Sequence, residues 1–168
     1  MAQHAGYNRF CYNYGLELYN SIDHKEIKGG VTKKIGAIKK VFTNVTKKRP
    51  EFAWTNRLSS KVYQSAFRDC SDAISRHLKG LSGAPVKKRK KDINSFTVYD
   101  GNGLVVIDAG KRIRLPTLGV FRLHESLSCR YVTQTFTITR TADKWFVSFA
   151  VNAEKIPPLF HEVSETVG

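Results

Sequence analysis

Residues that build disulfide frameworks and metal sites are scarce in this sequence. Its 168 residues include only three cysteines, Cys11, Cys70 and Cys129, and none belongs to a Cys-x-x-Cys pair. An odd number of widely spaced cysteines argues against both a disulfide framework and a zinc knuckle, and it favours a reducing compartment. The N-terminal segment lacks the apolar core of a secretory signal, and no apolar run approaches the roughly 20 residues of a membrane-spanning helix.

Recognisable catalytic patterns are also missing. The five histidines are scattered without zinc-ligand spacing, and there is no Walker motif, nucleophile elbow or convincing acid–base pair. Asp69 and Asp72 could resemble a metal pair on one helix. Arginines flank both, however, and ion pairs along the helix explain them better. On its own residues the chain is therefore expected to be no enzyme and to hold no metal or cofactor.

Negative charge is in short supply, and positive charge is clustered. Lys and Arg number 28 against 14 Asp and Glu, which gives a net charge of +14. Such an excess attracts polyanions, nucleic acid above all. A membrane surface ranks well below nucleic acid, because no basic helix carries the bulky apolar face that interfacial insertion needs. The clustered cations are Lys33, Lys34, Lys39, Lys40, Lys47, Lys48 and Arg49, and then the run Lys87, Lys88, Arg89, Lys90 and Lys91.

Apolar residues recur at helical spacing in three N-terminal segments, at about 5 to 22, 31 to 45 and 58 to 79. Before the third, P-E-F-A-W-T-N predicts a short helical turn whose Phe52 and Trp54 enter the core, which is favoured over an exposed role in stacking on bases. The positions expected to face inward are Tyr7, Phe10, Cys11, Tyr14, Leu18 and Ile22, then Val31, Ile35, Ile38, Phe42 and Val45, then Val62, Ala66, Cys70, Ile74 and Leu78. The third helix presents an outer stripe of Lys61, Gln64, Arg68, Asp72 and Arg76. Such a stripe is usually a solvated face, although Lys61, Gln64 and Arg68 could also touch DNA.

From Ser95 onward the apolar period changes to two, which predicts short strands in an antiparallel barrel or sandwich. T-A-D-K is expected to connect the last two strands as a hairpin, followed by a buried face of Trp145, Val147, Phe149 and Val151. Thr133, Thr135, Thr137 and Thr139 share one strand face, as ordinary β-surface or as phosphate contacts. The fold class is therefore expected to be α+β.

The order of several motifs resembles the N-terminal part of TnpB/OrfB-type transposon proteins. The matching segments are Y-N-R-F-C-Y-N-Y-G-L-E-L-Y, S-S-K-V-Y-Q-S-A-F-R-D-C-S-D-A-I, G-A-P-V-K-K-R-K-K-D-I-N-S-F, I-R-L-P-T-L-G and T-F-T-I-T-R-T-A-D-K-W-F-V-S-F. That family comprises RNA-guided DNA nucleases related to type V CRISPR effectors, long described as probable transposases acting in transposition and DNA recombination. The resemblance implies a helical, helix-turn-helix-like recognition region over residues 1–85, a basic linker over 86–92, a wedge-type β-barrel over 93–153, and at 154–168 the lead-in to a RuvC-like nuclease domain.

The resemblance further implies a cytoplasmic, nucleoid-associated protein that grips a transposon-derived guide RNA and reads a short motif in target DNA. It places the DNA against Ser59, Ser60, Lys61, Gln64 and Arg68. RNA and backbone contacts are expected from Lys33, Lys34, Lys40, Lys87, Lys88, Arg89, Lys90, Lys91, Lys111, Arg112 and Arg114. Relative to the family, a first barrel strand and all RuvC carboxylates are missing, so a truncated chain that binds without cutting is expected.

Two other functions remain open. A free-standing DNA-binding regulator would insert the helix at 58–79 into the major groove, bind duplex DNA without RNA and form dimers. A non-functional truncated transposon product would bind neither RNA nor DNA specifically, because its basic faces would simply be solvated.

Overall fold

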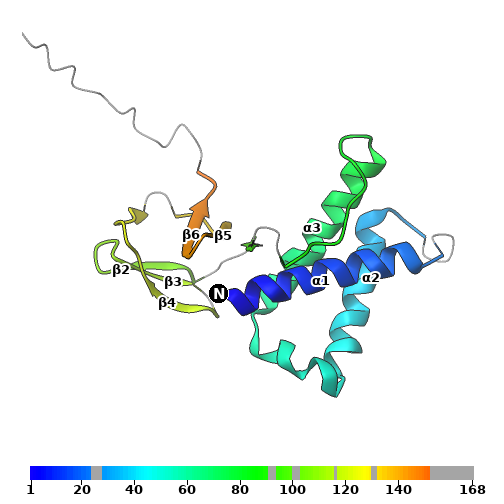
Figure 1. Ribbon diagram of the computed structural model, residues 1–168, viewed down its shortest axis with the longest axis horizontal. Coiled ribbons are helices and arrows are strands. Elements are labelled where there is room, and N and C mark those ends of the chain that lie inside the picture. The colour runs from blue at the N-terminus through cyan, green and yellow to red at the C-terminus, as the bar shows by residue number, and fades with distance from the viewer. Residues whose placement is uncertain (24–27, 91–93, 100–102, 116, 130–131, 152–168) are drawn as a thin grey trace, which may run out of the picture.

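The computed structural model describes residues 1–23, 28–90, 94–99, 103–115, 117–129 and 132–151. Its helices are α1 (Ala2–Ser21), α2 (Val31–Asn44) and α3 (Ser60–Leu78), with 3-10 helices η1 (Thr46–Lys48) and η2 (Pro50–Arg57). The strands are β1 (Ser95–Val98), β2 (Val105–Ile107), β3 (Arg112–Leu115), β4 (Gly119–Arg122), β5 (Phe136–Thr141) and β6 (Lys144–Phe149). Helices gather on one side and strands on the other (Figure 1). The predicted α+β class and the three predicted helices are confirmed.

The core of the helical region is built from aromatic rings. Phe42 of α2 lies 5.3 Å from Tyr14 of α1 and 5.5 Å from Phe67 of α3, measured between ring centroids. The helices α1 and α3 approach closely at Gly15, where an added Cβ would lie 3.1 Å from the Phe67 ring. Tilted ring contacts of this kind add to the free energy gained from apolar burial. They hold the three helices in one bundle.

Burial extends around most of α1, which the predicted single apolar face did not anticipate. Tyr7 and Cys11 are buried as predicted, whereas Phe10, Tyr14, Leu18 and Ile22 are only partly buried. Tyr12, Leu16 and Tyr19 are buried as well. The helix contacts α2, α3 and β1, so it has little solvent-facing surface on which to place polar residues. Apolar residues are accordingly spread around α1, and they do not gather on a single face.

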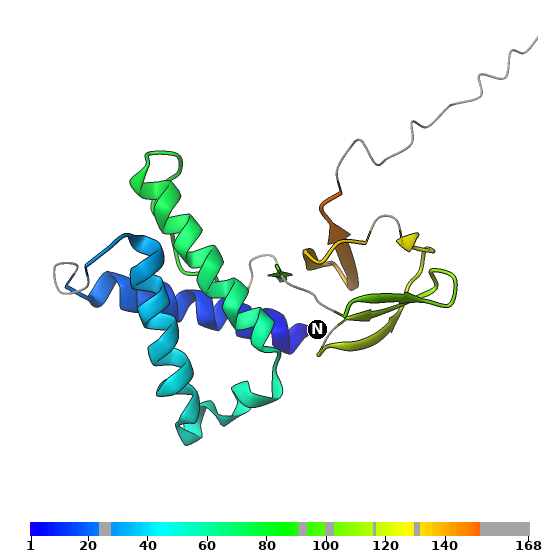
Figure 2. The same ribbon diagram turned by 180° about the vertical axis from the view of Figure 1, so that it is seen from behind.

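Four further predicted core positions are wrong or only partly right. Leu78 is 66% exposed because it ends α3, which projects beyond its neighbours at that end (Figure 2). Val45 follows the last residue of α2 and is also exposed. Phe52 is half-buried as part of η2, whereas Trp54 is 43% exposed. The indole ring of Trp54 nevertheless packs edge-on against Tyr7 and Phe10 and so covers the bundle from outside.

The strands form two antiparallel sheets, ordered β1-β5-β6 and β2-β3-β4. In the first, Ser95 pairs with Thr139, and Thr141 pairs with Lys144 across the predicted hairpin. In the second, Ile113 pairs with Val106 and Phe121. No ladder joins the two sheets within the residues that the structure describes, so antiparallel strands are confirmed but a closed barrel is not observed. Trp145, Val147, Phe149 and Val151, the predicted buried face, are half-buried.

Strand β1 ties the sheet to the helices. The side-chain amide of Asn8 on α1 donates a hydrogen bond of 3.1 Å to the Ser95 carbonyl, and Arg9 donates one of 3.2 Å to Asn94. Buried side chains of both sheets and of all three α-helices belong to one apolar cluster. None of the described helices combines the length and apolar character needed to cross a bilayer.

Candidate nucleic-acid interface

The start of α3 fixes which of the predicted DNA-contacting residues face solvent. Ser59 is the N-cap: its hydroxyl accepts a 3.3 Å hydrogen bond from the Lys61 amide, which satisfies one of the unpaired amides that every helix start carries. The Ser59 amide donates to Nε2 of His4 at 3.3 Å, and the residue is only 5% exposed. Ser59 therefore serves the helix end and offers no surface to a ligand.

Three of the other predicted residues form one exposed row. Ser60, Gln64 and Arg68 are spaced by four residues along α3 and all face solvent. Residues at this spacing lie above one another on a helix face. Lys61, one position off the row, is half-buried. The row therefore presents a hydroxyl, an amide and a guanidinium group in succession.

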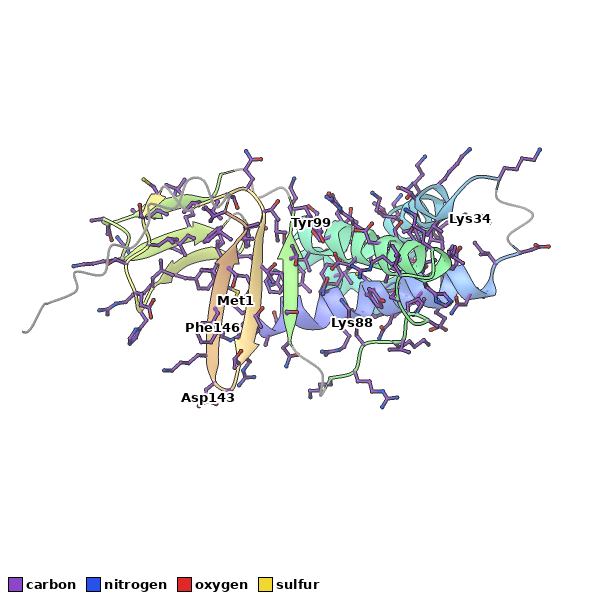
Figure 3. All side chains as sticks on the ribbon, turned by 90° about the horizontal axis from the view of Figure 1, so that it is seen from above. Met1, Lys34, Lys88, Tyr99, Asp143 and Phe146 are labelled. Atoms are coloured by element: carbon purple, nitrogen blue, oxygen red, sulfur yellow. The ribbon has the colours of Figure 1, made fainter. Side chains whose placement is uncertain are left out.

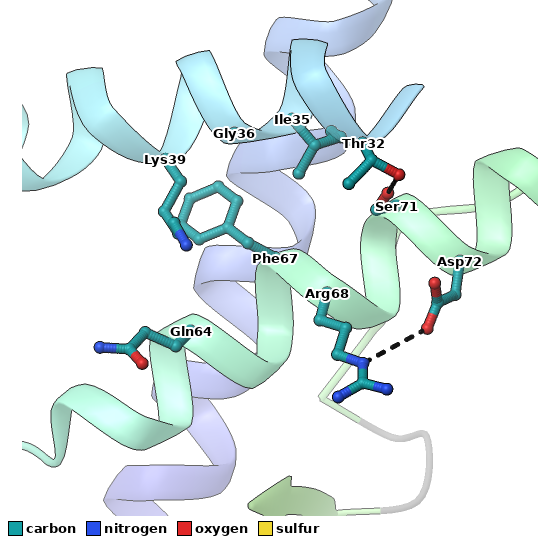
Figure 4. Close-up of a pocket in the computed structure, with 9 residues that line it drawn as sticks. All are labelled: Thr32, Ile35, Gly36, Lys39, Gln64, Phe67, Arg68, Ser71 and Asp72. Atoms are coloured by element: carbon teal, nitrogen blue, oxygen red, sulfur yellow. Dashed lines mark hydrogen bonds and ion pairs between the residues drawn. The ribbon is translucent and has the colours of Figure 1, made fainter. Parts of the chain in front are cut away.

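The row borders a groove between α2 and α3 with a volume of about 290 Å³ (Figure 4). Gln64, Arg68 and Asp72 line it from α3, and Lys39 lines it from α2. Ile35, Gly36 and Phe67 contribute apolar lining. The groove thus has an apolar interior, and its rim carries the two cations Lys39 and Arg68 together with the carboxylate of Asp72.

Arg68 is held in place by neighbours from two elements. Its Nε lies 4.0 Å from an Asp72 carboxylate oxygen, and its Cζ lies 4.0 Å from the ring centroid of Tyr99, which follows β1. The Tyr99 hydroxyl donates a 2.8 Å hydrogen bond to Asp69. Burial raises the pKa of Asp69, against the lowering effect of this hydrogen bond. The ion-pair interpretation is thus confirmed for Asp72, whereas the partner of Asp69 is a tyrosine.

No metal site accompanies these carboxylates. The described part of the chain contains no group of three or more His, Cys, Asp or Glu side chains placed to hold a metal ion. Three cysteines are free, with Cys11 and Cys70 buried and Cys129 exposed. Asp69 and Asp72 act in hydrogen bonding and ion pairing.

The basic run begins as a strap laid along α1, defined here as residues 87–90. Lys87 forms an ion pair of 2.6 Å with Glu17. The backbone amide and carbonyl of Lys88 are both hydrogen-bonded to the side chain of Asn13, at 2.8 and 2.9 Å. The Lys88 ammonium lies 4.3 Å from the ring centroid of Tyr12, and Figure 3 places it beside α1. Burial lowers the pKa of Lys88, and nearby Asp69 partly offsets this effect.

The strap changes what the predicted basic patch can offer. Lys88 is committed to α1, whereas Arg89 and Lys90 are exposed. Lys91 lies outside the described residues. On α2, Lys33 and Lys40 are exposed and Lys34 is half-buried. Lys87 and Lys88 of the strap therefore take part in folding contacts.

The sheet β2-β3-β4 carries a second cationic face. Lys111 is exposed beside it, and Arg112 and Arg114 of β3 point outward, alternating with the buried Ile113 and Leu115. Arg112 forms an ion pair with Asp108 and lies opposite Arg122 of β4 in the register. Arg122 was not predicted as a site residue. Only the pairing of β3 with β4, which the sequence does not state, brings it to this face.

Together these features define a basic α+β protein that displays cations on an exposed helix row, on α2 and on one sheet face. No protein family model matches the sequence. The chain is 25% identical over 169 residues to the Escherichia coli K12 protein named "Putative RNA-guided DNA endonuclease InsQ". The similarity covers 100% of this chain and 40% of that protein, so the chain spans well under half the length of its relative.

Proposed function

We propose that this chain is a nucleic-acid-binding portion of a TnpB/OrfB-type RNA-guided DNA endonuclease, with no cleavage site of its own. The observation that carries the proposal is the similarity to InsQ, which runs through the whole chain and agrees with the family motifs in its sequence. In this proposal residues 1–85 are the recognition region, 86–92 the linker, 93–153 a wedge-type barrel and 154–168 the lead-in to a nuclease domain. Membership of this family would make guide RNA and target DNA the partners of the chain.

The exposed row of α3 is the proposed DNA contact. Gln64 can hydrogen-bond the N6 and N7 edge of adenine, and Arg68 can bind guanine O6 and N7 or a phosphate. Ser60 supplies a hydroxyl one turn before Gln64. Lys61 contributes charge from the side of the row, and Ser59 contributes only through the helix start. These exposed side chains offer donors and acceptors of the kind that base edges accept.

The guide RNA is proposed to lie along cations that contact phosphates without reading sequence. On α2 these are Lys33, Lys34 and Lys40. On the strap they are Arg89 and Lys90, together with Lys91. At the sheet they are Lys111, Arg112 and Arg114, and we add Arg122 because it shares their face.

Selection from a randomised duplex DNA library tests the DNA contact. We expect the full chain, loaded with RNA that copurifies with it, to enrich a short motif. Gln64→Ala and Arg68→Ala should each relax the preference at one base, a change of roughly tenfold per position for a lost bidentate contact. Arg76→Ala is the matched control, because it removes the same charge from an exposed position farther along α3. Equal effects of Arg68→Ala and Arg76→Ala would show that positive charge on α3 is enough for the preference, and they would reject Arg68 as a base contact.

A free-standing DNA-binding regulator is the competing function, because it uses the same exposed row of α3. It requires motif enrichment in ribonuclease-treated protein, and the RNA-guided proposal requires the loss of that enrichment. Incubation with Mg²⁺, RNA and matched duplex should leave the DNA intact. Cleavage that persists through purification would contradict the proposed lack of a cleavage site.

A further inference from the structure

Tyr99 lies where the sheet meets the proposed DNA-reading row. It follows the last residue of β1, and its side chain reaches the helical region, as Figure 3 shows. Its ring lies beneath the Arg68 guanidinium, with Cζ 4.0 Å from the ring centroid. Its hydroxyl donates a 2.8 Å hydrogen bond to Asp69, which neighbours Arg68 on α3. Tyr99 therefore contacts two consecutive residues of α3, Arg68 and Asp69.

These contacts restrict Arg68 on two sides. A guanidinium placed over the face of an aromatic ring is attracted to it, so the Tyr99 ring favours a position of the Arg68 head group above its own face. The Asp72 carboxylate lies 4.0 Å from Nε and attracts that side of the guanidinium. The terminal nitrogens extend past this ion pair in Figure 4, and the side chain remains 60% exposed. The guanidinium thus has two neighbours that restrict its position, while its terminal nitrogens stay open to solvent.

The ring itself is anchored. The hydrogen bond to Asp69 fixes its position relative to α3, and Thr135 of the neighbouring segment donates a 3.0 Å hydrogen bond to the Tyr99 carbonyl. Burial, followed by the hydrogen bond to Asp69, raises the pKa of Tyr99 to about 12. The phenol therefore keeps its proton at neutral pH and remains a donor.

We infer that Tyr99 is a positioning residue that pre-orients Arg68 as a bidentate donor for a guanine edge, so that specificity at one base depends on the sheet as well as on α3. This inference rests on the proposed DNA contact of α3. Without the ring, an arginine must lose several side-chain rotations each time it binds a base. Holding it beforehand lowers that entropic cost, and it does so only for the base whose edge fits the fixed fork.

The test uses variants of the full chain and the duplex enriched from the randomised library. Tyr99→Leu removes the ring, and Tyr99→Phe keeps the ring but removes its hydrogen bond. We expect Tyr99→Leu to lower the preference for guanine over adenine at the Arg68 base by roughly two- to fivefold, the scale of an exposed cation–π contact. Tyr99→Phe should retain most of the preference. Affinity for a duplex that lacks this guanine should not change for either variant.

A second measurement covers the case in which Tyr99→Leu does not fold. In the wild-type chain, the NMR signals of the Arg68 side chain should show ring-current shifts that those of Arg76 lack. Their absence would overturn the inference. So would loss of guanine preference in Arg68→Ala combined with full preference in a folded Tyr99→Leu variant, because Arg68 would then act without the ring. If Arg68→Ala itself leaves the preference intact, the proposed DNA contact fails instead.

Discussion

His4 illustrates how one side chain of α1 controls the start of α3. Its Nε2 accepts the hydrogen bond of the Ser59 amide, which only a ring nitrogen without a proton can do. Burial is the main cause that lowers the pKa of His4 below its usual 6.5, and the N-terminal charge adds to it. The folded chain therefore prefers the neutral ring. A protonated His4 ring could not accept the hydrogen bond of the Ser59 amide through Nε2, and its charge would be costly to bury.

This preference predicts a loss of stability in mild acid. The unfolded chain takes up a proton on His4 as the pH falls through 6.5, whereas the folded chain resists until a lower pH. The stabilisation is therefore complete above 6.5 and is lost as the pH falls through the folded pKa. Urea unfolding at about pH 7.5 and about pH 5 should show a drop in the wild type that is smaller in His4→Gln, whose amide oxygen still accepts a hydrogen bond. An equal drop in both proteins would show that other groups cause it.

At the scale of elements, the strap behaves as a part of the helical fold. Asn13 holds both backbone groups of Lys88, and the ion pair of Lys87 with Glu17 lies one helical turn along α1. These side-chain hydrogen bonds satisfy backbone groups that an extended segment would otherwise have to pair with a neighbouring strand. The strap thereby fixes where the chain leaves the helices for β1.

Replacing Asn13 should release the strap. Asn13→Ala removes both hydrogen bonds, so we expect the free energy of unfolding to fall by about 1–2 kcal/mol. Trypsin should then cut after Lys87 or Lys88 faster than in the wild type. Asn20→Ala is the matched control, because Asn20 is an exposed asparagine on the same helix. Unchanged cleavage in Asn13→Ala would mean that other contacts hold the strap.

Periodicity predicted the elements better than it predicted their contacts. The spacing of Ile35, Ile38 and Phe42 locates α2 and its buried face, because that helix has one solvated side. A helix packed on several sides gives no such contrast, so the burial of Tyr12 was not predictable. The same limit applies to the site. Gln64 and Arg68 follow from helical spacing, whereas Tyr99 depends on how β1 docks against α3.

At the scale of the whole molecule, charge is spread over surfaces of different kinds. The net charge of +14 would attract any polyanion from a distance, wherever its cations lie. Close contacts to phosphate are a separate matter, because a cation that is exposed and makes few folding contacts reaches a phosphate at the lowest cost. Lys33 and Lys40 on α2 are exposed, whereas Lys87 has an ion-pair partner and Lys88 is packed on Tyr12.

Two double variants with the same loss of charge separate these effects. Lys33→Ala with Lys40→Ala, and Lys87→Ala with Lys88→Ala, each lower the net charge by two. Because each lost phosphate contact reduces the slope of log affinity against log salt by roughly one, the α2 pair should flatten the slope for RNA by about two units. The strap pair should flatten it by less and lower the free energy of unfolding instead. Titration of RNA into each protein over a range of salt concentrations measures the slopes. Equal slopes in the two variants would mean that net charge alone governs binding, and the assignment of α2 as an RNA contact would fall.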